Sequence, residues 1–241
     1  MSMLYHTRAT GTLSASTAAT GYEAVNANDY AVGRAWRSTT AGASWLQIDL
    51  GSSRSLDAIC INETNAASVA VTYGASSPPG STLGTLATHA DGQGRRKGRI
   101  EGDVARYVRL SFSGTPTDGA AYWTVGSLLL LTDQLAVPDP LLPLQLDFER
   151  GQDNVQLPNG RELPIVRGVS RARLGLSWRV VADVDIEAAA RTLRAQECWL
   201  DLAVADRPDL QWPVSFPGKQ FSRRIEGFNR ERFDLQLLER A

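Results

Sequence analysis

The side chains best suited to chemistry in this sequence are aromatic and basic residues in two polar segments. One segment holds Tyr30, Arg34 and Trp36, and the other holds the neighbouring pair Tyr122 and Trp123. Aromatic rings stack on the apolar faces of sugars, while Arg side chains hydrogen-bond their hydroxyl groups. These residue types predict a shallow glycan-binding platform. The alternative is that Trp36 and Trp123 are core or loop-anchoring residues, because large aromatic side chains are mostly buried; for Trp36 this alternative is the stronger one.

Catalytic motifs find little support in the chain. His6 and His89 lie in polar surroundings without the spacing of a zinc-binding helix, and no nucleophile elbow is present in the sequence. Asp183, Asp185 and Glu187 could be imagined as an acid pair for glycoside hydrolysis. However, Asp185 is a plausible helix N-cap and Glu187 suits the first helical turn. We therefore predict that the protein is not an enzyme. A small hydrolase is a less favoured interpretation than the two binding functions described below.

A basic stretch at residues 95–99 follows Gly92 and Gly94 and could suggest a phosphate cradle. The glycine spacing fits neither a dinucleotide-binding nor a Walker motif, and the residues that follow read as a strand rather than a helix. We interpret residues 95–99 as a solvated loop tip. Contact with an acidic polysaccharide is the lesser alternative.

Length and composition indicate two globular domains of ordinary size. The chain has 241 residues, of which 43% are hydrophobic and 21% charged, and its formal net charge of -1 gives no reason to expect a nucleic-acid partner. The first six residues lack the features of a secretory signal, and the apolar run at 128–131 is far too short to span a bilayer. Cys60 and Cys198 lie in apolar stretches, which favours two buried thiols in a reducing cytoplasm.

Strand patterns dominate the first half, which we assign to residues 1–135. Residues 45–50 and 106–112 alternate between apolar and polar side chains, as half-buried strands do, and residues 58–61 are apolar throughout, as in a strand covered on both faces. Regular strands separated by turn residues predict a β-sandwich.

The second half, residues 144–241, follows a Pro-rich segment at 136–143 that we interpret as a stiff linker. Its pattern predicts an alternating strand at 173–181, one helix beginning near Asp185, a strand at 198–202 and a last strand through 233–237. Pro208, Pro213 and Pro217 predict a long loop before that last strand. The order of elements is typical of an α+β domain.

Five motifs of the first half occur in the order and spacing of the discoidin family, which includes carbohydrate-binding modules. They are residues 13–16 (LSAS), 26–29 (NAND), 36–38 (WRS), 45–51 (WLQIDLG) and 106–110 (RYVRL). The resemblance covers nearly all of residues 10–132. It implies an eight-stranded jelly-roll β-sandwich that binds glycans, lipids or proteins through loops at one end, where both aromatic segments would lie.

The chain departs from the calcium-binding members of that family. Asp29 is followed by Tyr30 where those members have glycine, and residues 126–130 contain no carboxylate. A hard cation needs several oxygen ligands. We therefore predict no metal and no other cofactor.

The second half resembles, more distantly, the tube-forming domains of bacteriophage distal tail and baseplate proteins. That resemblance implies a structural tail-tip component, present in the virion and assembled in the host cytoplasm. It also implies that identical copies of the chain form a symmetric ring, with a hexamer as the family's ring order. The other partners would be tail proteins and host-surface glycans. Neither nucleic-acid binding nor membrane insertion is expected. The main alternative is an accessory carbohydrate-binding module of a polysaccharide-degrading enzyme. The sequence leaves the identity of the glycan open.

Overall fold

A computed structural model describes residues 2–28, 34–88, 96–137, 145–156, 162–180, 198–201, 211–215, 221–227 and 230–239. Beyond residue 134 the description is of the backbone alone. The chain divides into two compact units. The larger part of the N-terminal unit is Tyr5–Gln134, and the C-terminal unit is mostly Leu135–Asp206 and Leu210–Ala241.

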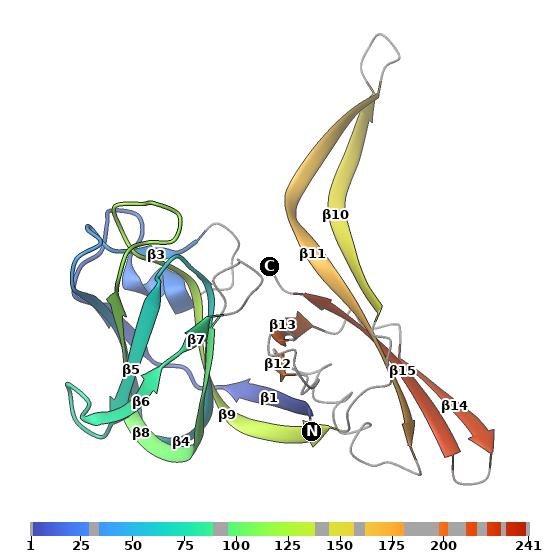
Figure 1. Ribbon diagram of the computed structural model, residues 1–241, viewed down its shortest axis with the longest axis horizontal. Coiled ribbons are helices and arrows are strands. Elements are labelled where there is room, and N and C mark those ends of the chain that lie inside the picture. The colour runs from blue at the N-terminus through green and yellow to red at the C-terminus, as the bar shows by residue number, and fades with distance from the viewer. Residues whose placement is uncertain are drawn as a thin grey trace. The chain divides into compact units, whose positions relative to one another are not determined.

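The described part of the N-terminal unit consists of strands with one short 3-10 helix (Figure 1). Its elements are β1 (Ser2–Arg8), β2 (Thr12–Ala15), η1 (Ala24–Asn28), β3 (Trp36–Arg37), β4 (Ser44–Thr64), β5 (Ser68–Gly74), β6 (Ser81–Thr85), β7 (Ala87–Thr88), β8 (Arg96–Ser113) and β9 (Thr124–Val137). Residues 2–4 of β1 and 135–137 of β9 belong to the C-terminal unit. The strand order is β1-β9-β4-β8-β5-β6, with β2 beside β4, β3 beside β9 and β7 beside β8.

Two long strands, β4 and β8, belong to both layers of a sandwich. Residues 44–49 of β4 pair with residues 107–112 of β8, and residues 58–61 of β4 pair with 96–99 of β8. Between these stretches the register shifts, and Gly51 (φ 76°) and Gly102 (φ 82°) adopt backbone conformations that favour glycine. The first layer therefore contains β2, β5 and β6, and the second contains β1, β3, β7 and β9.

The core lies between the layers and confirms the predicted strand faces. Leu46 and Ile48 of β4 and Leu110 of β8 are buried together with Ile59 of β4 and Leu130 of β9. Every residue of the apolar stretch 58–61 is buried as well. Burial of these side chains on both sides of the core is what holds the two layers together.

The first and last strands of this unit lie side by side. The Ala9 backbone N–H donates to the carbonyl oxygen of Leu130 at 2.8 Å, and Thr132 Oγ1 donates to the Thr7 carbonyl oxygen at 3.1 Å. The chain therefore enters and leaves the sandwich at one place.

The described part of the C-terminal unit is formed by antiparallel strands. They are β10 (Gln145–Gln156), β11 (Glu162–Val180), β12 (Cys198–Asp201), β13 (Gln211–Ser215), β14 (Phe221–Gly227) and β15 (Arg230–Glu239). β10 and β11 form a long hairpin (Figure 1), and β15 pairs with β11, β13 and β14. The register places Trp178 opposite Phe233 and Leu176 opposite Leu235.

These strands confirm three sequence predictions and correct one. The expected strand at 233–237 lies within β15, and those at 173–181 and 198–202 agree with β11 and β12 up to Val180 and Asp201, beyond which one expected residue of each lies outside the described residues. The expected loop is wrong at Pro213, which lies in β13, because proline is tolerated in a strand where its nitrogen need not donate. β10 and β14 were not expected from the sequence.

Other expectations fall outside the described residues. They concern the helix near Asp185, Pro208, Pro217 and most of the linker. β9 includes the first two residues of the expected linker, Ala136 and Val137. Across the ranges that the structure describes, no helix has the length and apolar character needed to cross a membrane.

Candidate functional site

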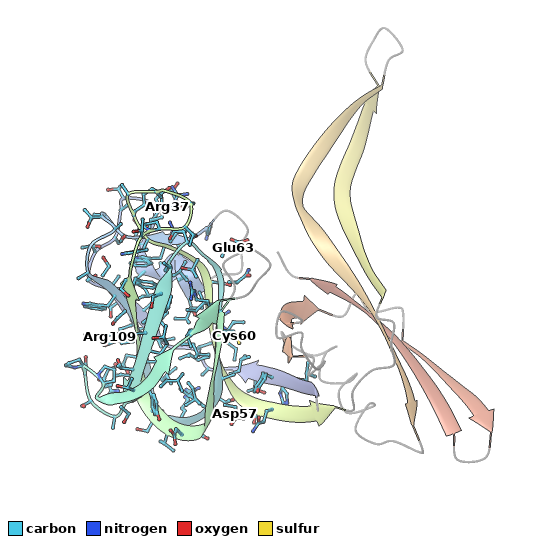
Figure 2. The ribbon with its side chains drawn as sticks, in the orientation of Figure 1. Arg37, Asp57, Cys60, Glu63 and Arg109 are labelled. Atoms are coloured by element: carbon cyan, nitrogen blue, oxygen red, sulfur yellow. The ribbon has the colours of Figure 1, made fainter. Side chains whose placement is uncertain are left out.

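An arginine held between two tyrosine rings lies among the loops at one end of the sandwich. The guanidinium carbon of Arg37 is 3.9 Å from the centre of the Tyr22 ring and 5.1 Å from that of the Tyr122 ring. All three side chains are partly exposed. Figure 2 shows Arg37 at the end of the unit opposite Asp57. We refer to Tyr22, Arg37 and Tyr122 as the Arg37 cluster.

Arg37 points away from the core because its neighbour Trp36 points into it. The Trp36 side chain is fully buried, its ring lies 5.2 Å from that of Phe112, and its indole N–H donates to the Thr17 carbonyl oxygen at 3.0 Å. Successive side chains of a strand project to opposite faces. The buried tryptophan therefore fixes the direction of the arginine.

Backbone hydrogen bonds fix Tyr22 beside Arg37. The Arg37 N–H donates to the Tyr22 carbonyl oxygen at 3.2 Å, and the Ala19 N–H donates to the Arg37 carbonyl oxygen at 2.9 Å. The Asn26 side chain donates from Nδ2 to the Ala35 carbonyl oxygen at 3.3 Å. The segment before η1 is thus attached to β3, and Tyr22 is held in position with it.

Asn65 fixes the loop that carries Tyr122. This side chain is 5% exposed and donates from Nδ2 to the Tyr122 carbonyl oxygen and to Asp118 Oδ1, both at 3.0 Å. Its Oδ1 accepts the Thr124 N–H at 2.8 Å, and its own carbonyl oxygen accepts the Thr117 N–H at 2.8 Å. Hydrogen bonds from the Ala120 N–H and from Asn65 lower the pKa of Asp118, so that carboxylate stays ionised.

Trp123 supports the same loop from the core. Its side chain is fully buried and its indole N–H donates to the Gly42 carbonyl oxygen at 2.8 Å. The Trp123 and Ser38 backbones are also joined, because the Ser38 N–H donates to the Trp123 carbonyl oxygen at 3.0 Å. Ser38 Oγ accepts the Trp123 N–H at 2.8 Å. The Arg37 cluster therefore rests on a rigid framework.

No carboxylate of the described residues pairs with Arg37. Its Nε is buried and has no hydrogen-bond acceptor in that part of the chain. The contacts of its guanidinium group are the two tyrosine rings. A guanidinium group remains charged at any physiological pH, so the cluster presents a positive charge that the described residues do not neutralise.

The structure separates the five residues that the sequence suggested. Trp36 and Trp123 are 0% exposed, so neither ring is part of a glycan-binding surface and both belong to the core beneath the site. This confirms the core interpretation that was the stronger one for Trp36 and corrects the assignment of Trp123. Arg34 is exposed, Tyr122 is a member of the Arg37 cluster, and Tyr30 lies outside the described residues.

The sequence interpretation missed Tyr22 and Arg37. A usable signal for Arg37 was present, because successive strand residues project to opposite faces and Trp36 is buried. Tyr22 lies in a turn without a regular period, and no pattern in the sequence places it beside Arg37.

A second correction concerns Arg96, which is not part of a solvated loop tip. It begins β8 with 1% of its side chain exposed. Its Nη1 donates to the Leu86 carbonyl oxygen at 3.1 Å, and its Nη2 donates to the carbonyl oxygens of Ala66 and Ala67. Burial lowers its pKa, and the backbone acceptors compensate for the lost hydration of the charged group.

Two further arginines lie on the first layer. Arg109, in β8, has its guanidinium carbon 4.4 Å from the Trp45 ring centre and donates from Nε to Gln47 Oε1 at 2.9 Å. Arg106 forms two hydrogen bonds with the Asp49 carboxylate, at 2.8 and 3.0 Å. Hydrogen bonds from Arg106 and from the Gly51 N–H, with the charge of Arg106, lower the pKa of Asp49 to about 2.

Titratable groups elsewhere in the described ranges form no metal-binding cluster. No group of three or more His, Cys, Asp or Glu side chains gathers there in a way that could hold a metal ion. Burial lowers the pKa of His6 despite the opposing effects of Asp133 and Asp57. His89, Asp183, Asp185 and Glu187 lie outside the described residues.

The chain is similar to several solved structures, but its sequence identifies no family. The sequence matches no protein-family model, and it matches no curated protein. It is similar to the structure of chitosan-binding module 1, derived from a chitosanase/glucanase of Paenibacillus sp. IK-5, with 24% identity over 52% of this chain and 98% of that one and a TM-score of 0.43.

Two other solved structures show similar scores. A fucolectin from serum of the striped bass, Morone saxatilis, is 14% identical over 51% of this chain and 45% of that one, with a TM-score of 0.42. A pectin-binding carbohydrate-binding module is 20% identical over 52% of this chain and 91% of that one, with a TM-score of 0.43. The N-terminal region resembles discoidin-like carbohydrate-binding modules and lectins.

Proposed function

We propose that the N-terminal unit binds glycans through the Arg37 cluster. The observation that carries the proposal is a pair of partly exposed tyrosine rings around an arginine whose charge no described residue neutralises. Tyrosine rings offer apolar surface for a sugar ring, and the arginine offers donors for its oxygen atoms. The discoidin-like motifs of the sequence support the same function.

The hydrogen bonds beneath the Arg37 cluster favour binding because they fix its side chains before a ligand arrives. Tyr122 is fixed through Asn65 and Tyr22 through the backbone of Arg37. A binding surface that is already rigid loses little conformational entropy when a ligand arrives. We expect a shallow site, for which one copy should bind with a free energy on the order of 4 kcal/mol, a millimolar affinity, and many copies together would bind strongly.

The proposal extends to a setting in a phage-like tail tip, where the C-terminal unit forms a symmetric ring and the N-terminal unit contacts host-surface glycans. This extension rests on the sequence resemblance alone. The alternative setting is an accessory module of a polysaccharide-degrading enzyme. Quantitative mass spectrometry of purified particles distinguishes them: a fixed, symmetric copy number supports the tail setting, and occurrence only beside a secreted enzyme supports the alternative.

A glycan array with the full-length chain tests the binding function itself. Tyr22→Ala and Tyr122→Ala together should abolish binding while leaving the thermal unfolding temperature close to that of the wild type, because both rings are partly exposed. Tyr107→Ala is the matched control. Tyr107 is also partly exposed, and its ring centre lies 4.9 Å from the guanidinium carbon of Arg106, which is not a member of the Arg37 cluster. Unchanged binding in the double variant would remove the proposed site.

A further inference from the structure

We infer that the glycan bound at the Arg37 cluster is acidic, with a sugar carboxylate bound by the edge of the Arg37 guanidinium group. This inference rests on the proposed function and names the class of ligand. It begins with the geometry of the cluster, in which one tyrosine ring lies 3.9 Å and the other 5.1 Å from the guanidinium carbon.

The surroundings of the guanidinium group determine which of its atoms a ligand could reach. Its contacts among the described residues are the two tyrosine rings, which engage the cation through their π-electrons. The Nε atom is buried and has no acceptor within the described ranges. The two terminal nitrogens are therefore the donors that remain for a ligand, and they form a planar fork.

Two other arginines of the unit, Arg106 and Arg96, have hydrogen-bond acceptors within the chain. Arg106 forms two hydrogen bonds with the Asp49 carboxylate. Arg96 donates to three backbone carbonyl oxygens. For Arg37 the described residues supply neither kind of acceptor, so the complementary oxygen atoms are left for the ligand.

A carboxylate satisfies this requirement better than a hydroxyl group does. Its two oxygen atoms match the two donors of the fork, and its negative charge makes both hydrogen bonds stronger than bonds between neutral groups. A sugar acid also places its ring next to the carboxylate, within reach of the tyrosine rings that flank Arg37. The ligand class that fits is thus a glycan with hexuronate or sialate units.

The test uses an array of matched pairs with the full-length protein. Oligomers of glucuronate, galacturonate and mannuronate are each printed beside their carboxyl-reduced, neutral counterparts, and sialyllactose is printed beside lactose. We expect at least one acidic member to bind about tenfold or more tightly than its neutral partner. Sodium acetate at equal carboxylate concentration should not compete, which separates a sugar acid from a free carboxylate.

Measuring both members of a bound acidic and neutral glycan pair with wild type and with Arg37→Gln completes a double-mutant cycle. If Arg37 contacts the carboxylate, the substitution should remove the preference for the acid while changing affinity for the neutral partner little. Equal losses for both partners would show that Arg37 merely supports the tyrosines and would overturn the inference. Arg109→Gln is the matched control, because Arg109 also stacks on an aromatic ring but lies outside the cluster, and it should keep the preference.

A measurement on the wild type keeps the inference testable should Arg37→Gln fail to fold. Raising the salt concentration from about 0.05 M to about 0.5 M should weaken binding of the acidic glycan and leave binding of the neutral one nearly unchanged. Tight binding of neutral glycans without preference for their acidic partners would overturn the inference and leave the proposed function intact. Absence of binding to every glycan would overturn both.

Discussion

Arg37 and Arg96 show two different ways in which one sandwich holds an arginine without a carboxylate partner among the described residues. At the loop end, Arg37 is partly exposed between Tyr22 and Tyr122, and its buried Nε has no acceptor in that part of the chain. In the interior, Arg96 is 1% exposed and its Nε also has no acceptor, but its two terminal nitrogens donate to three backbone carbonyl oxygens. The two arginines therefore differ in their terminal nitrogens, which have acceptors within the fold at Arg96 and none among the described residues at Arg37.

The comparison teaches that the hydrogen-bond partners of the terminal nitrogens distinguish a structural arginine from one that we propose binds a ligand. A buried charge without acceptors costs too much to persist, so Arg96 must be served by the chain itself. A partly exposed charge can rely on water until a ligand replaces that water. Substitutions at the two positions should therefore change different properties of the protein.

The largest effect should come from Arg96→Ala. The substitution leaves carbonyl oxygens of Ala66, Ala67 and Leu86 without their donor, and we expect the free energy of unfolding to fall by about 3 kcal/mol or more. Urea unfolding followed by tryptophan fluorescence measures it. Arg37→Ala serves as the matched variant and should lower the free energy of unfolding by less than about 1 kcal/mol while removing the preference for acidic glycans. Equal costs at both positions would break the comparison.

Asn65→Ala should give an intermediate effect that connects stability with binding. It removes the hydrogen bonds that hold Asp118, Tyr122 and Thr124, and we expect a loss of about 2 kcal/mol. Hydrogen–deuterium exchange should speed up in the loop at residues 114–123, and glycan affinity should fall although Asn65 is nearly buried. Normal affinity together with faster exchange in that loop would mean that Tyr122 need not be fixed.

The smallest effect should come from the exposed pair of Asp49 and Arg106. The pKa of Asp49 is lowered to about 2 from 3.8, first by the hydrogen bond from Arg106. A lowered pKa stabilises the folded state above pH 3.8, and that contribution is lost as the pH falls toward about 2. The thermal unfolding temperature of the wild type should therefore fall slightly more steeply over this range than that of Asp49→Asn. Parallel curves would show that the pair contributes nothing to stability.

Periodic patterns in the sequence predicted the strands but not the site. The alternation of Leu46, Ile48 and Leu110 with polar neighbours predicts strand faces that are buried, and all three side chains are buried. The burial of Arg96 could not be predicted, since its acceptors come from loops that are distant in sequence and carry no side-chain signal. The same reason hides Tyr22, which reaches Arg37 through backbone hydrogen bonds. Aromatic residue type alone did not separate the supporting Trp123 from the partly exposed Tyr122.

The adjacency of the first and last strands has a consequence for the evolution and engineering of this unit. Ala9 and Leu130 are joined by a backbone hydrogen bond of 2.8 Å, so the ends of the sandwich are separated by little more than one interstrand spacing. A host protein could accommodate such a unit within a surface turn without moving the flanking segments apart. We therefore expect that the sandwich can be inserted at an exposed turn of an unrelated protein and still fold, with the loops around Arg37 accessible to a ligand.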